Sequence, residues 1–489
     1  MNRRTKIVAT LGPSTDDPQA LEALIRAGCD VVRINFSHGD PETHSRRIRM
    51  VRAAARELDT DVAVLADLAG PKIRIDRFRD GAVELEKGQA FTLIAEDPPP
   101  PGDRTGVGVA YLDLPGDVKP GSELLLDDGL IAMQVERVAG TRIHCTVLTA
   151  GRLYDRKGLN LRGGGLSLPG VSKADEADIR RAADWQVDYL AVSFPRSAAD
   201  IEQARTLLRR AGGEAHIVSK IERTEAIDNL DEVIEASDAV LVARGDLGVE
   251  IGEAELPGLQ KKIIATSLAL NRPVITATQM MQSMVESPVP TRAEVLDVAN
   301  AVIDGTDAVM LSAETAVGRH PARVIEAMAR ICEGAERHVQ ATIPQRRLIV
   351  KPERTDQAIA MAAMITAANV PVRAIVALTE SGSTARWLSR VRSPVPIIAL
   401  SPNRASLRRM RLYQHVFPLF FATEAADGTE SGRQAVDHVL RAGLVDPGDR
   451  VILTLGDEMG LEGGTNTMKI VTVGQRGGDG DRQGEFENL

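Results

Sequence analysis

A short apolar run that ends in polar or charged residues, followed by a helical stretch, recurs through most of this 489-residue chain. Continuous apolar runs rich in β-branched residues are typical of strands buried on both faces, as in parallel sheets. The runs occupy residues 7–10, 31–37, 62–67, 189–194, 216–222, 239–246, 273–279 and 308–314. Eight strand–helix units predict an α/β fold with a closed (β/α)8 TIM barrel. The alternative is an open doubly wound sheet, which we disfavour because no G-x-G-x-x-G follows an early strand.

The barrel pattern is interrupted once and later replaced. Short alternating runs separated by Gly, Pro and Asp turns predict a small β-barrel domain inserted in a barrel loop, where insertions often act as lids. Farther along, strands at 374–378, 397–400 and 451–455 alternate with helices, which predicts a separate C-terminal α/β domain. We expect barrel segments at 1–70 and 169–344, the lid at 71–168, the C-terminal regulatory domain at 345–474 and a disordered tail at 475–489.

The composition excludes several classes of protein. A formal net charge of -9 argues against nucleic acid or an anionic membrane as the main partner, because both select basic surfaces. Cys29, Cys145 and Cys332 lack metal-binding spacing, and their odd number fits a reducing cytoplasm better than a disulfide framework. Gly12 and Pro13 break the apolar run near the start, so we expect no signal peptide. No apolar stretch approaches the length of a membrane span, and we expect a cytoplasmic protein.

Charged and hydroxyl side chains gather where the predicted strands end, which is where TIM barrels carry their active sites. Glu222 and Asp246 end neighbouring strands, and two carboxylates suit a Mg²⁺ ion that keeps positions for substrate oxygens. Lys220 points the same way as Glu222, because strand side chains alternate with period two. An ammonium beside a metal favours an enolate or a transferring phosphoryl group, and Arg33 adds a planar phosphate donor. The alternative is a rim of mutually satisfied salt bridges.

These motifs resemble those of the pyruvate kinases, in the order of that family and over nearly the whole chain. The matching segments are 33–39 (RINFSHG), 67 with 70–74 (GPKIR), 157–158 (KG), 219–222 (SKIE), 243–250 (ARGDLGVE), 277–280 (ATQM), 290–294 (PTRAE) and 310–315 (MLSAET). The bacterial branch is the most similar. The resemblance implies Mg²⁺-dependent phosphoryl transfer from phosphoenolpyruvate to ADP in glycolysis, giving pyruvate and ATP, with Mn²⁺ able to replace Mg²⁺. It also implies allosteric regulation and a homotetramer.

The resemblance implies roles for the charged rim residues. Lys220 would contact the transferring phosphoryl group and stabilise the enolate, and Arg33 would bind phosphoryl oxygens. Glu222 and Asp246 would hold the divalent metal. Catalysis would then rest on positioning and charge neutralisation, with little covalent chemistry by the protein.

The resemblance also implies sites for the rest of the substrates. The backbone amides of Gly245 and Asp246, with Thr278, would bind the substrate carboxylate, and Thr278 and Ser312 would assist protonation of the enolate through ordered water. The residues implied for nucleotide or its phosphates are Asn35, His38, Arg74 and Lys157. Because Lys157 belongs to the lid, lid closure would bring it to the substrates and exclude water.

One pair of residues departs from many family members, which need K⁺. Their K⁺ ligands match Asn35, Ser37, Asp67 and the carbonyl of Leu68, and those members carry Glu at the position of Lys72 and Thr at that of Leu68. A lysine ammonium can replace a bound monovalent cation. The resemblance therefore points to the K⁺-independent branch. The alternative is that Lys72 is a solvated charge and K⁺ is still used.

A second phosphate site is expected in the C-terminal domain, where hydroxyls follow a strand and open a helix. In the family this loop holds the phosphate of an allosteric effector, with the Gly-rich segment 456–467 as the other wall. The simpler interpretation is a capped helix start, since Ser and Thr are common N-caps. The residues concerned are Thr379, Ser381, Gly382, Ser383 and Thr384.

Two other functions share parts of this pattern. A metal-dependent aldolase or lyase acting on pyruvate enolate would use the same Lys, Glu and Asp rim, without needing the lid or the 33–38 motif. A non-catalytic metabolite sensor would be expected to lose Lys220 or a metal carboxylate, and both are present. Neither a P-loop nor protein-kinase motifs occur.

Overall fold

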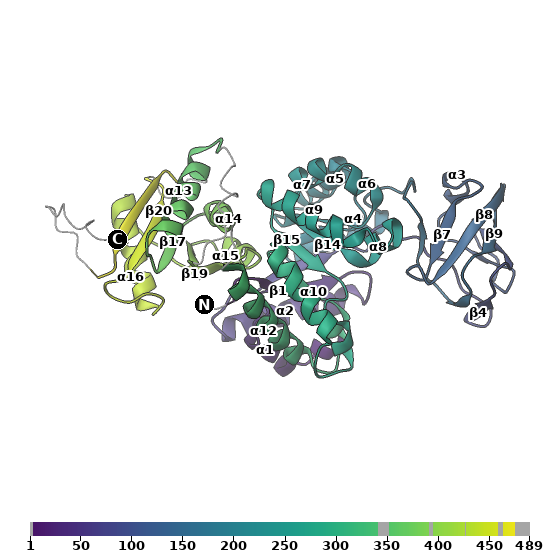
Figure 1. Ribbon diagram of the computed structural model, residues 1–489, viewed down its shortest axis with the longest axis horizontal. Coiled ribbons are helices and arrows are strands. Elements are labelled where there is room, and N and C mark those ends of the chain that lie inside the picture. The colour runs from purple at the N-terminus through teal and green to yellow at the C-terminus, as the bar shows by residue number, and fades with distance from the viewer. Residues whose placement is uncertain (1–2, 341–351, 391–394, 426, 458–462, 475–489) are drawn as a thin grey trace. The chain divides into compact units, whose positions relative to one another are not determined.

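The computed structural model of the chain describes residues 3–340, 352–390, 395–425, 427–457 and 463–474. The predicted disordered tail at 475–489 and part of the predicted effector loop at 456–467 lie outside the described residues. Contacts divide the chain into two compact units, one with the barrel, the insertion and residues 411–414, the other with the remaining C-terminal residues (Figure 1). No helix in these described ranges is long and apolar enough to cross a membrane.

The first unit contains a closed barrel of eight parallel strands, in the order β1-β16-β15-β14-β13-β12-β3-β2. The barrel strands are β1 (Lys6–Thr10), β2 (Val31–Asn35), β3 (Ala63–Asp67), β12 (Tyr189–Val192), β13 (His216–Ile221), β14 (Ala239–Ala243), β15 (Val274–Ala277) and β16 (Ala308–Leu311). Almost every residue in these strands is buried, because helices cover the outer face and side chains fill the interior. The predicted TIM barrel is therefore confirmed.

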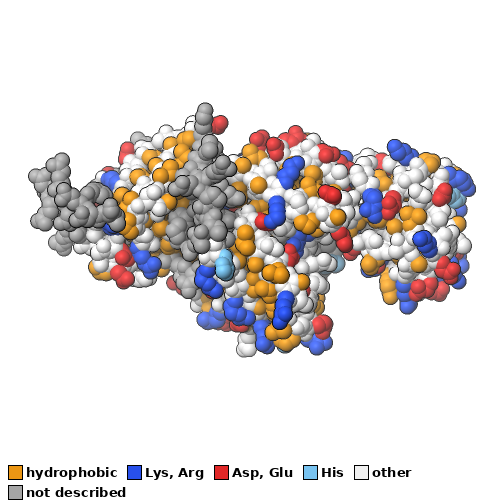
Figure 2. All heavy atoms as spheres, in the orientation of Figure 1, with side chains coloured by type: hydrophobic (Ala, Val, Ile, Leu, Met, Phe, Trp, Pro, Cys, Tyr) orange, Lys and Arg blue, Asp and Glu red, His pale blue; other side chains and the backbone are white. Residues whose placement is uncertain are grey.

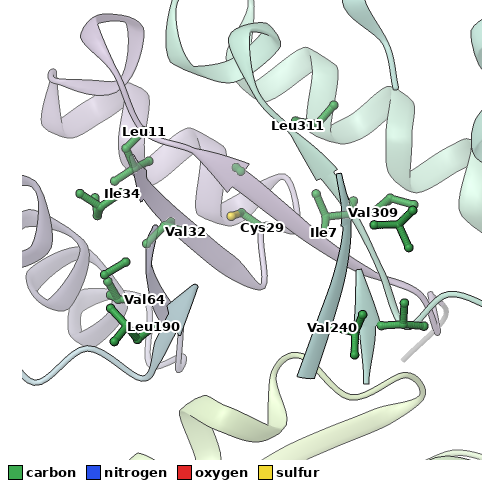
Figure 3. Packing of buried hydrophobic residues seen from close by; sticks show 14 of the residues in the cluster. Ile7, Leu11, Cys29, Val32, Ile34, Val64, Leu190, Val240, Val309 and Leu311 are labelled. Carbon is green, nitrogen blue, oxygen red and sulfur yellow. The ribbon is translucent and has the colours of Figure 1, made fainter. Parts of the chain in front are cut away.

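Helices surround the barrel and pack on its apolar strands. They are α1 (Pro18–Arg26), α2 (Pro41–Glu57), α4 (Lys173–Asp184), α5 (Ala198–Arg210), α6 (Thr224–Asp228), α7 (Leu230–Ala236), α8 (Arg244–Ile251), α9 (Leu256–Ala269), α10 (Arg292–Asp304), α11 (Ala313–Ala316) and α12 (Pro321–Gln340), with short 3-10 turns η1 (Pro13–Thr15) and η2 (Gln282–Val285). Ser172 and Thr291 begin α4 and α10 with capping boxes that satisfy otherwise unpaired amides. Figure 3 shows Ile7, Val64 and Val309 in the resulting core.

Four aspartates form a repeated device at the N-terminal end of the barrel. Each directly precedes one of the alternate strands β2, β12, β14 and β16, and its carboxylate accepts an amide N–H of the neighbouring strand. The pairs are Asp30 with Ile7 (2.9 Å), Asp188 with Val64 (2.8 Å), Asp238 with Ile217 (2.8 Å) and Asp307 with Val274 (3.0 Å). We call these four residues the aspartate ring. It joins the strands two by two at the end opposite the predicted active site.

Arginines neutralise three members of the aspartate ring. Arg3, Arg52 and Arg205 contact Asp30, Asp188 and Asp238 at 2.8, 2.8 and 2.7 Å. The fourth member, Asp307, also accepts the amide N–H of Gln414 at 3.0 Å. A buried carboxylate is stabilising only when it is paired and hydrogen-bonded. The arginines and the strand N–H groups meet both conditions for Asp30, Asp188 and Asp238.

The insertion between β3 and α4 forms its own domain. Six strands make an open sheet, a half-barrel, in the order β11-β7-β8-β9-β5-β6, and β10 pairs with β4 beside it. Leu93, Leu124, Met133 and Ile143 lie in a separate apolar core. Its elements are β4 (Ala82–Leu85), β5 (Ala90–Ile94), β6 (Gly106–Gly108), α3 (Leu114–Asp117), β7 (Glu123–Leu126), β8 (Ile131–Ala139), β9 (Arg142–Val147), β10 (Gly151–Tyr154) and β11 (Leu159–Leu161). The predicted inserted β domain is confirmed.

The second unit is an α/β domain with a five-stranded sheet in the order β19-β18-β17-β20-β21. The strands run parallel except for β21, which is antiparallel to β20. Its elements are α13 (Thr355–Asn369), β17 (Ala374–Leu378), α14 (Ser383–Arg390), β18 (Ile397–Ser401), α15 (Arg404–Met410), β19 (Val416–Phe420), α16 (Gly428–Arg441), β20 (Arg450–Leu455) and β21 (Thr467–Thr472). The predicted C-terminal α/β domain is confirmed.

Candidate active site

Lys220 lies at the centre of a charged cluster at the C-terminal end of the barrel. Its ammonium contacts Glu222 Oε1 at 2.8 Å and Asp67 Oδ1 at 3.4 Å, and it donates to Ser193 Oγ at 2.7 Å. Burial lowers the pKa of Lys220, but the two carboxylates outweigh burial and raise it to about 12. The ammonium therefore stays charged throughout the neutral and alkaline range.

Arg33 completes the cationic side of this cluster. Its Nε lies 2.6 Å from Asp67 Oδ2, and its Nη1 donates to Thr10 Oγ1 at 3.1 Å. Burial alone would raise the pKa of Asp67, but Lys220 and Arg33 outweigh it and hold that pKa below its usual value. Asp67 is thus an ionised carboxylate that orients two cations, and further donors of both cations remain for a substrate anion.

Glu222 and Asp246 are the predicted metal ligands, and their surroundings fit a cation. The backbone N–H of Phe194 donates to Glu222 Oε2 at 2.9 Å, which fixes the carboxylate. Burial, with repulsion from Asp246, raises the pKa of Glu222 to about 7 despite the attraction of Lys220. A divalent cation between these carboxylates would relieve that repulsion. Three or more clustered His, Cys, Asp or Glu ligands are not found in the described ranges, but Mg²⁺ needs only one or two protein carboxylates.

Gly245 and Thr278 meet where α8 begins. The backbone N–H of Gly245 donates to Thr278 Oγ1 at 2.9 Å. Thr278 and Gln279 have φ of 72° and 54°, a region that non-glycine residues seldom adopt. Arg244 holds this turn, since it donates to the carbonyls of Ala277 (3.1 Å) and Thr278 (2.6 Å). A strained turn held in this way is typical of a functional site, and the amides at the start of α8 favour an anion.

Ser312 follows β16 and is fixed through its backbone. Its N–H donates to Glu314 Oε2 at 2.7 Å, while Glu314 Oε1 accepts the N–H of Met281 at 3.1 Å. Glu314 is fully buried, so its carboxylate connects the loops after β15 and β16. The structure thereby holds the Ser312 and Thr278 loops together.

The predicted nucleotide residues fall into two groups. Arg74 and Lys157 come together on the two chain segments that join the lid, where the Ile75 N–H donates to the Lys157 carbonyl at 3.0 Å. Lys157 Nζ lies 2.7 Å from Asp127 Oδ1. Asn35 ends β2 and His38 lies in the loop that follows, and no hydrogen bond or ion pair joins the two groups among the described residues. An ADP molecule would have to span both groups.

The predicted monovalent-cation residues already have partners within the protein. Asn35 Oδ1 accepts the Ser37 N–H at 3.1 Å, and the Leu68 carbonyl accepts Ser193 Oγ at 2.8 Å. Lys72 Nζ contacts Asp246 Oδ1 at 2.9 Å. Its other ion-pair partner within the described ranges is Asp128, so Lys72 faces the predicted divalent-metal site and not Asp67.

The predicted effector loop lies at the start of α14 in the second unit. The Gly382 N–H donates to Thr379 Oγ1 at 3.0 Å, and Gly382 has a φ of 86°, which favours glycine. Thr384 Oγ1 lies 2.7 Å from Thr465 Oγ1, so the loop and the segment before β21 are in contact. Ser381 and Ser383 are partly exposed beside this turn.

Sequence reasoning missed Ser193, Phe194 and Arg244 as site residues. Ser193 anchors Lys220, Phe194 donates to Glu222, and Arg244 holds the Thr278 turn and contacts Asp297 at 2.6 Å. A signal for Ser193 was present, because it is a polar residue near the end of the predicted strand at 189–194. Phe194 is apolar and contributes its backbone N–H, which the side-chain pattern does not indicate. Arg244 lies within the motif at 243–250, but its contacts with the Thr278 carbonyl and Asp297 could not be predicted from that motif.

Comparisons with known proteins give the same family for both units of the chain. The family described as "Pyruvate kinase, barrel domain" matches residues 2–325, and "Pyruvate kinase, alpha/beta domain" matches residues 357–471. "Pyruvate kinase II" of Salmonella typhimurium is 50% identical over 475 residues, covering 96% of this chain and 99% of the relative. A "Pyruvate kinase" of Haemophilus influenzae is 48% identical, with the same coverage. The crystal structure of a pyruvate kinase from Cryptosporidium parvum has a TM-score of 0.88 at 33% identity and covers 96% of both chains.

Proposed function

The chain belongs to the pyruvate kinase family, and from that premise we propose which of its residues carry out the reaction and how they do so. Pyruvate kinase transfers the phosphoryl group of phosphoenolpyruvate to ADP, giving pyruvate and ATP. The observation that carries the proposal is the Lys220 cluster, which holds cations and carboxylates at the functional end of the barrel. The family assignment sets aside the aldolase and the sensor as alternatives.

Lys220 and Arg33 act on the transferring group. Phosphoryl transfer has a loose transition state whose charge spreads over oxygens, so catalysis depends on fixed cations. Asp67 and Ser193 hold the Lys220 ammonium in place, and Asp67 also holds Arg33. Neither cation has to reorganise when the phosphoryl group departs, and Lys220 remains to stabilise the enolate.

Glu222 and Asp246 would hold the divalent metal, which the family uses and which we propose to be Mg²⁺, with Mn²⁺ able to replace it. When bound, the metal supplies a divalent charge that neutralises developing negative charge. Glu222 is oriented for this role by the Phe194 N–H. Asp246 lies at the start of α8, next to the amides proposed to bind the substrate carboxylate.

The substrate carboxylate binds to the backbone amides of Gly245 and Asp246 and to Thr278. Support comes from the 2.9 Å contact between the Gly245 N–H and Thr278 Oγ1, because it shows an N–H that a carboxylate could share. We assign enolate protonation to Thr278 and Ser312 through ordered water. Running the reaction in deuterated solvent tests the assignment of the proton donor. Ser312→Ala should slow deuterium entry at carbon 3 of pyruvate.

The nucleotide binds between the lid and the end of β2 with its following loop, through Asn35, His38, Arg74 and Lys157. The pairing of Lys157 with Asp127 supports this, because that cation is held at the lid surface until a phosphate competes for it. Equilibrium dialysis with ADP tests the assignment. An unchanged ADP affinity in Arg74→Ala would remove Arg74 from the nucleotide site.

The enzyme should not require K⁺. Asp67 already contacts two cations, and the Leu68 carbonyl and Asn35 amide oxygen already accept hydrogen bonds, so little remains for a monovalent ion. We expect pyruvate formation from phosphoenolpyruvate, ADP and Mg²⁺ at equal rates with and without KCl, at matched ionic strength. Activity that appears only with KCl would keep the function and exclude K⁺ independence. No activity in either buffer, with sugar phosphates and AMP present, would contradict the proposed site.

A phosphorylated effector binds at the start of α14, through Thr379, Ser381, Gly382, Ser383 and Thr384. The turn at Gly382 brings the Thr379 hydroxyl to the helix start, where backbone N–H groups favour an anion. Sugar phosphates and AMP are the effectors to test in the pyruvate assay. Activation that survives Ser383→Asp, which places a carboxylate at the phosphate position, would exclude the site.

The enzyme acts as a homotetramer. Leu296 and Ile303 lie two turns apart on the same face of α10 and are 65% and 48% exposed, and Val289 before the helix is 58% exposed. Figure 2 shows hydrophobic side chains on this face of the barrel unit. Exposed apolar patches mark interaction surfaces, so we assign this face to a second copy of the chain. Light scattering should give four times the 52.5 kDa chain mass, and a monomer mass would exclude the assignment. A cytoplasmic location stays a prediction, which cell fractionation tests.

A further inference from the structure

Lys72 joins the first lid segment to the barrel rim. The residue lies just after the tight turn at Gly70, where its own N–H donates to the Gly70 carbonyl at 2.9 Å. Its side chain runs along the lid's return segment so closely that a Cβ on Gly158 would lie 2.9 Å from Lys72 Cε. The ammonium reaches across to Asp246 Oδ1, 2.9 Å away. One side chain thus connects both lid segments to the start of α8.

The Asp246 carboxylate has two uses that compete. It is a proposed ligand of the divalent metal, and in this structure one of its oxygens is neutralised by the Lys72 ammonium. A divalent cation at the same oxygen would repel the ammonium at close range, so binding of the metal weakens the contact between Lys72 and Asp246. Lys220 makes a comparable contact with Glu222, but it is also held by Asp67 and Ser193. Lys72 is therefore the cation that has to move.

The lid offers Lys72 another partner. Asp128 Oδ1 lies 3.9 Å from Lys72 Nζ, in the turn between β7 and β8, and its side chain is 75% exposed. An ammonium displaced from Asp246 would find this carboxylate within the lid. The exchange would replace a contact between lid and barrel by a contact inside the lid.

We propose that Lys72 is a metal-released latch of the lid. In the metal-free enzyme it holds the first lid segment to Asp246, and entry of the divalent metal breaks this contact and frees the segment to move. The inference rests on the proposed metal site. It concerns a different contact from the replacement of K⁺, because it involves Asp246 and not Asp67. Lys72 is a positioning residue here, since it acts through Asp246 and the lid.

Titration of the free enzyme with Mn²⁺, followed by electron paramagnetic resonance without substrates, tests the competition. Lys72→Met should bind Mn²⁺ about twofold to fivefold more tightly than the native enzyme, the size expected for a partly exposed ion pair. Lys157→Met is the matched control, because it removes the lid cation that pairs with Asp127 and should leave the affinity unchanged. Asp246→Asn should weaken Mn²⁺ binding strongly.

Hydrogen–deuterium exchange of the amides between residues 72 and 76 tests the release. In the native enzyme Mn²⁺ should raise their exchange rate about fivefold or more, while in Lys72→Met the rate should be high already and should not respond. Unchanged Mn²⁺ affinity in Asp246→Asn would refute the metal site itself. If Asp246→Asn loses affinity while Lys72→Met binds as the native enzyme does, the latch alone is refuted. Tighter binding in Lys72→Met without any exchange difference also refutes the latch.

Discussion

Replacing Lys220 by methionine should lower kcat by about three to four orders of magnitude, because it removes the cation on which phosphoryl and enolate charge develop. Methionine keeps much of the length of the side chain but leaves Asp67 with Arg33 as its one remaining partner cation among the residues that the structure describes. The pKa of Lys220 of about 12 means that the native enzyme uses the charged form at every working pH. Steady-state kinetics of pyruvate formation, at saturating Mg²⁺, measures the loss.

Two controls separate catalysis from damage to the site. Ser193→Ala keeps the Lys220 ammonium but removes its 2.7 Å hydrogen bond to Ser193 Oγ, together with the bond from that hydroxyl to the Leu68 carbonyl, and we expect it to lower kcat about tenfold or less. Mn²⁺ binding by Lys220→Met should remain measurable, since Glu222 and Asp246 are intact. A Lys220→Met enzyme that keeps more than about a tenth of the native kcat would show that another group stabilises the transition state.

The alternation of strand side chains was enough to place part of the active site. Period-two spacing put Lys220 and Glu222 on one face of a strand, and the structure has their charged groups 2.8 Å apart. Continuous apolar runs located the barrel strands within a few residues. The run at 308–314 extended too far, because β16 ends at Leu311 and Glu314 lies in α11. Polar residues at the end of a run belong to the loop that carries the function.

Contacts between distant segments could not be predicted in this way. Whether Lys72 would face Asp67 or Asp246 depends on the path of the lid segment past Gly158, which no local pattern encodes. The aspartate ring was also missed. Its members precede the apolar runs, where Asp is a common turn residue and gives no signal. Their hydrogen bonds to neighbouring strands follow only from the order of strands in the closed barrel.

Substitution in the aspartate ring should strongly reduce stability. Asp30→Asn should lower the free energy of unfolding by about 3 kcal/mol. Asp30 is buried, contacts Arg3 at 2.8 Å and accepts the Ile7 N–H. Asparagine keeps one acceptor but removes the charge that offsets the burial of Arg3 and Lys6. Burial, only partly offset by Asp30, already lowers the pKa of Lys6 to about 8. Urea unfolding at pH 7 measures the change, and Asp40→Asn, an exposed helix N-cap where asparagine serves equally well, should change it by less than about 0.5 kcal/mol.

The effect of Asp30→Asn should depend on pH in a defined direction. Burial raises the pKa of Asp30, but Arg3 and Lys6 outweigh it, so the folded pKa lies below the unfolded value of about 3.9. A depressed carboxyl pKa gives stability that is fully present above the unfolded pKa and is lost as pH falls through the folded pKa. The difference between native and variant urea midpoints should therefore be fully present at about pH 5 to 6 and shrink below about pH 4. A difference that stays unchanged through pH 4 would mean that Asp30 stabilises the barrel independently of its charge.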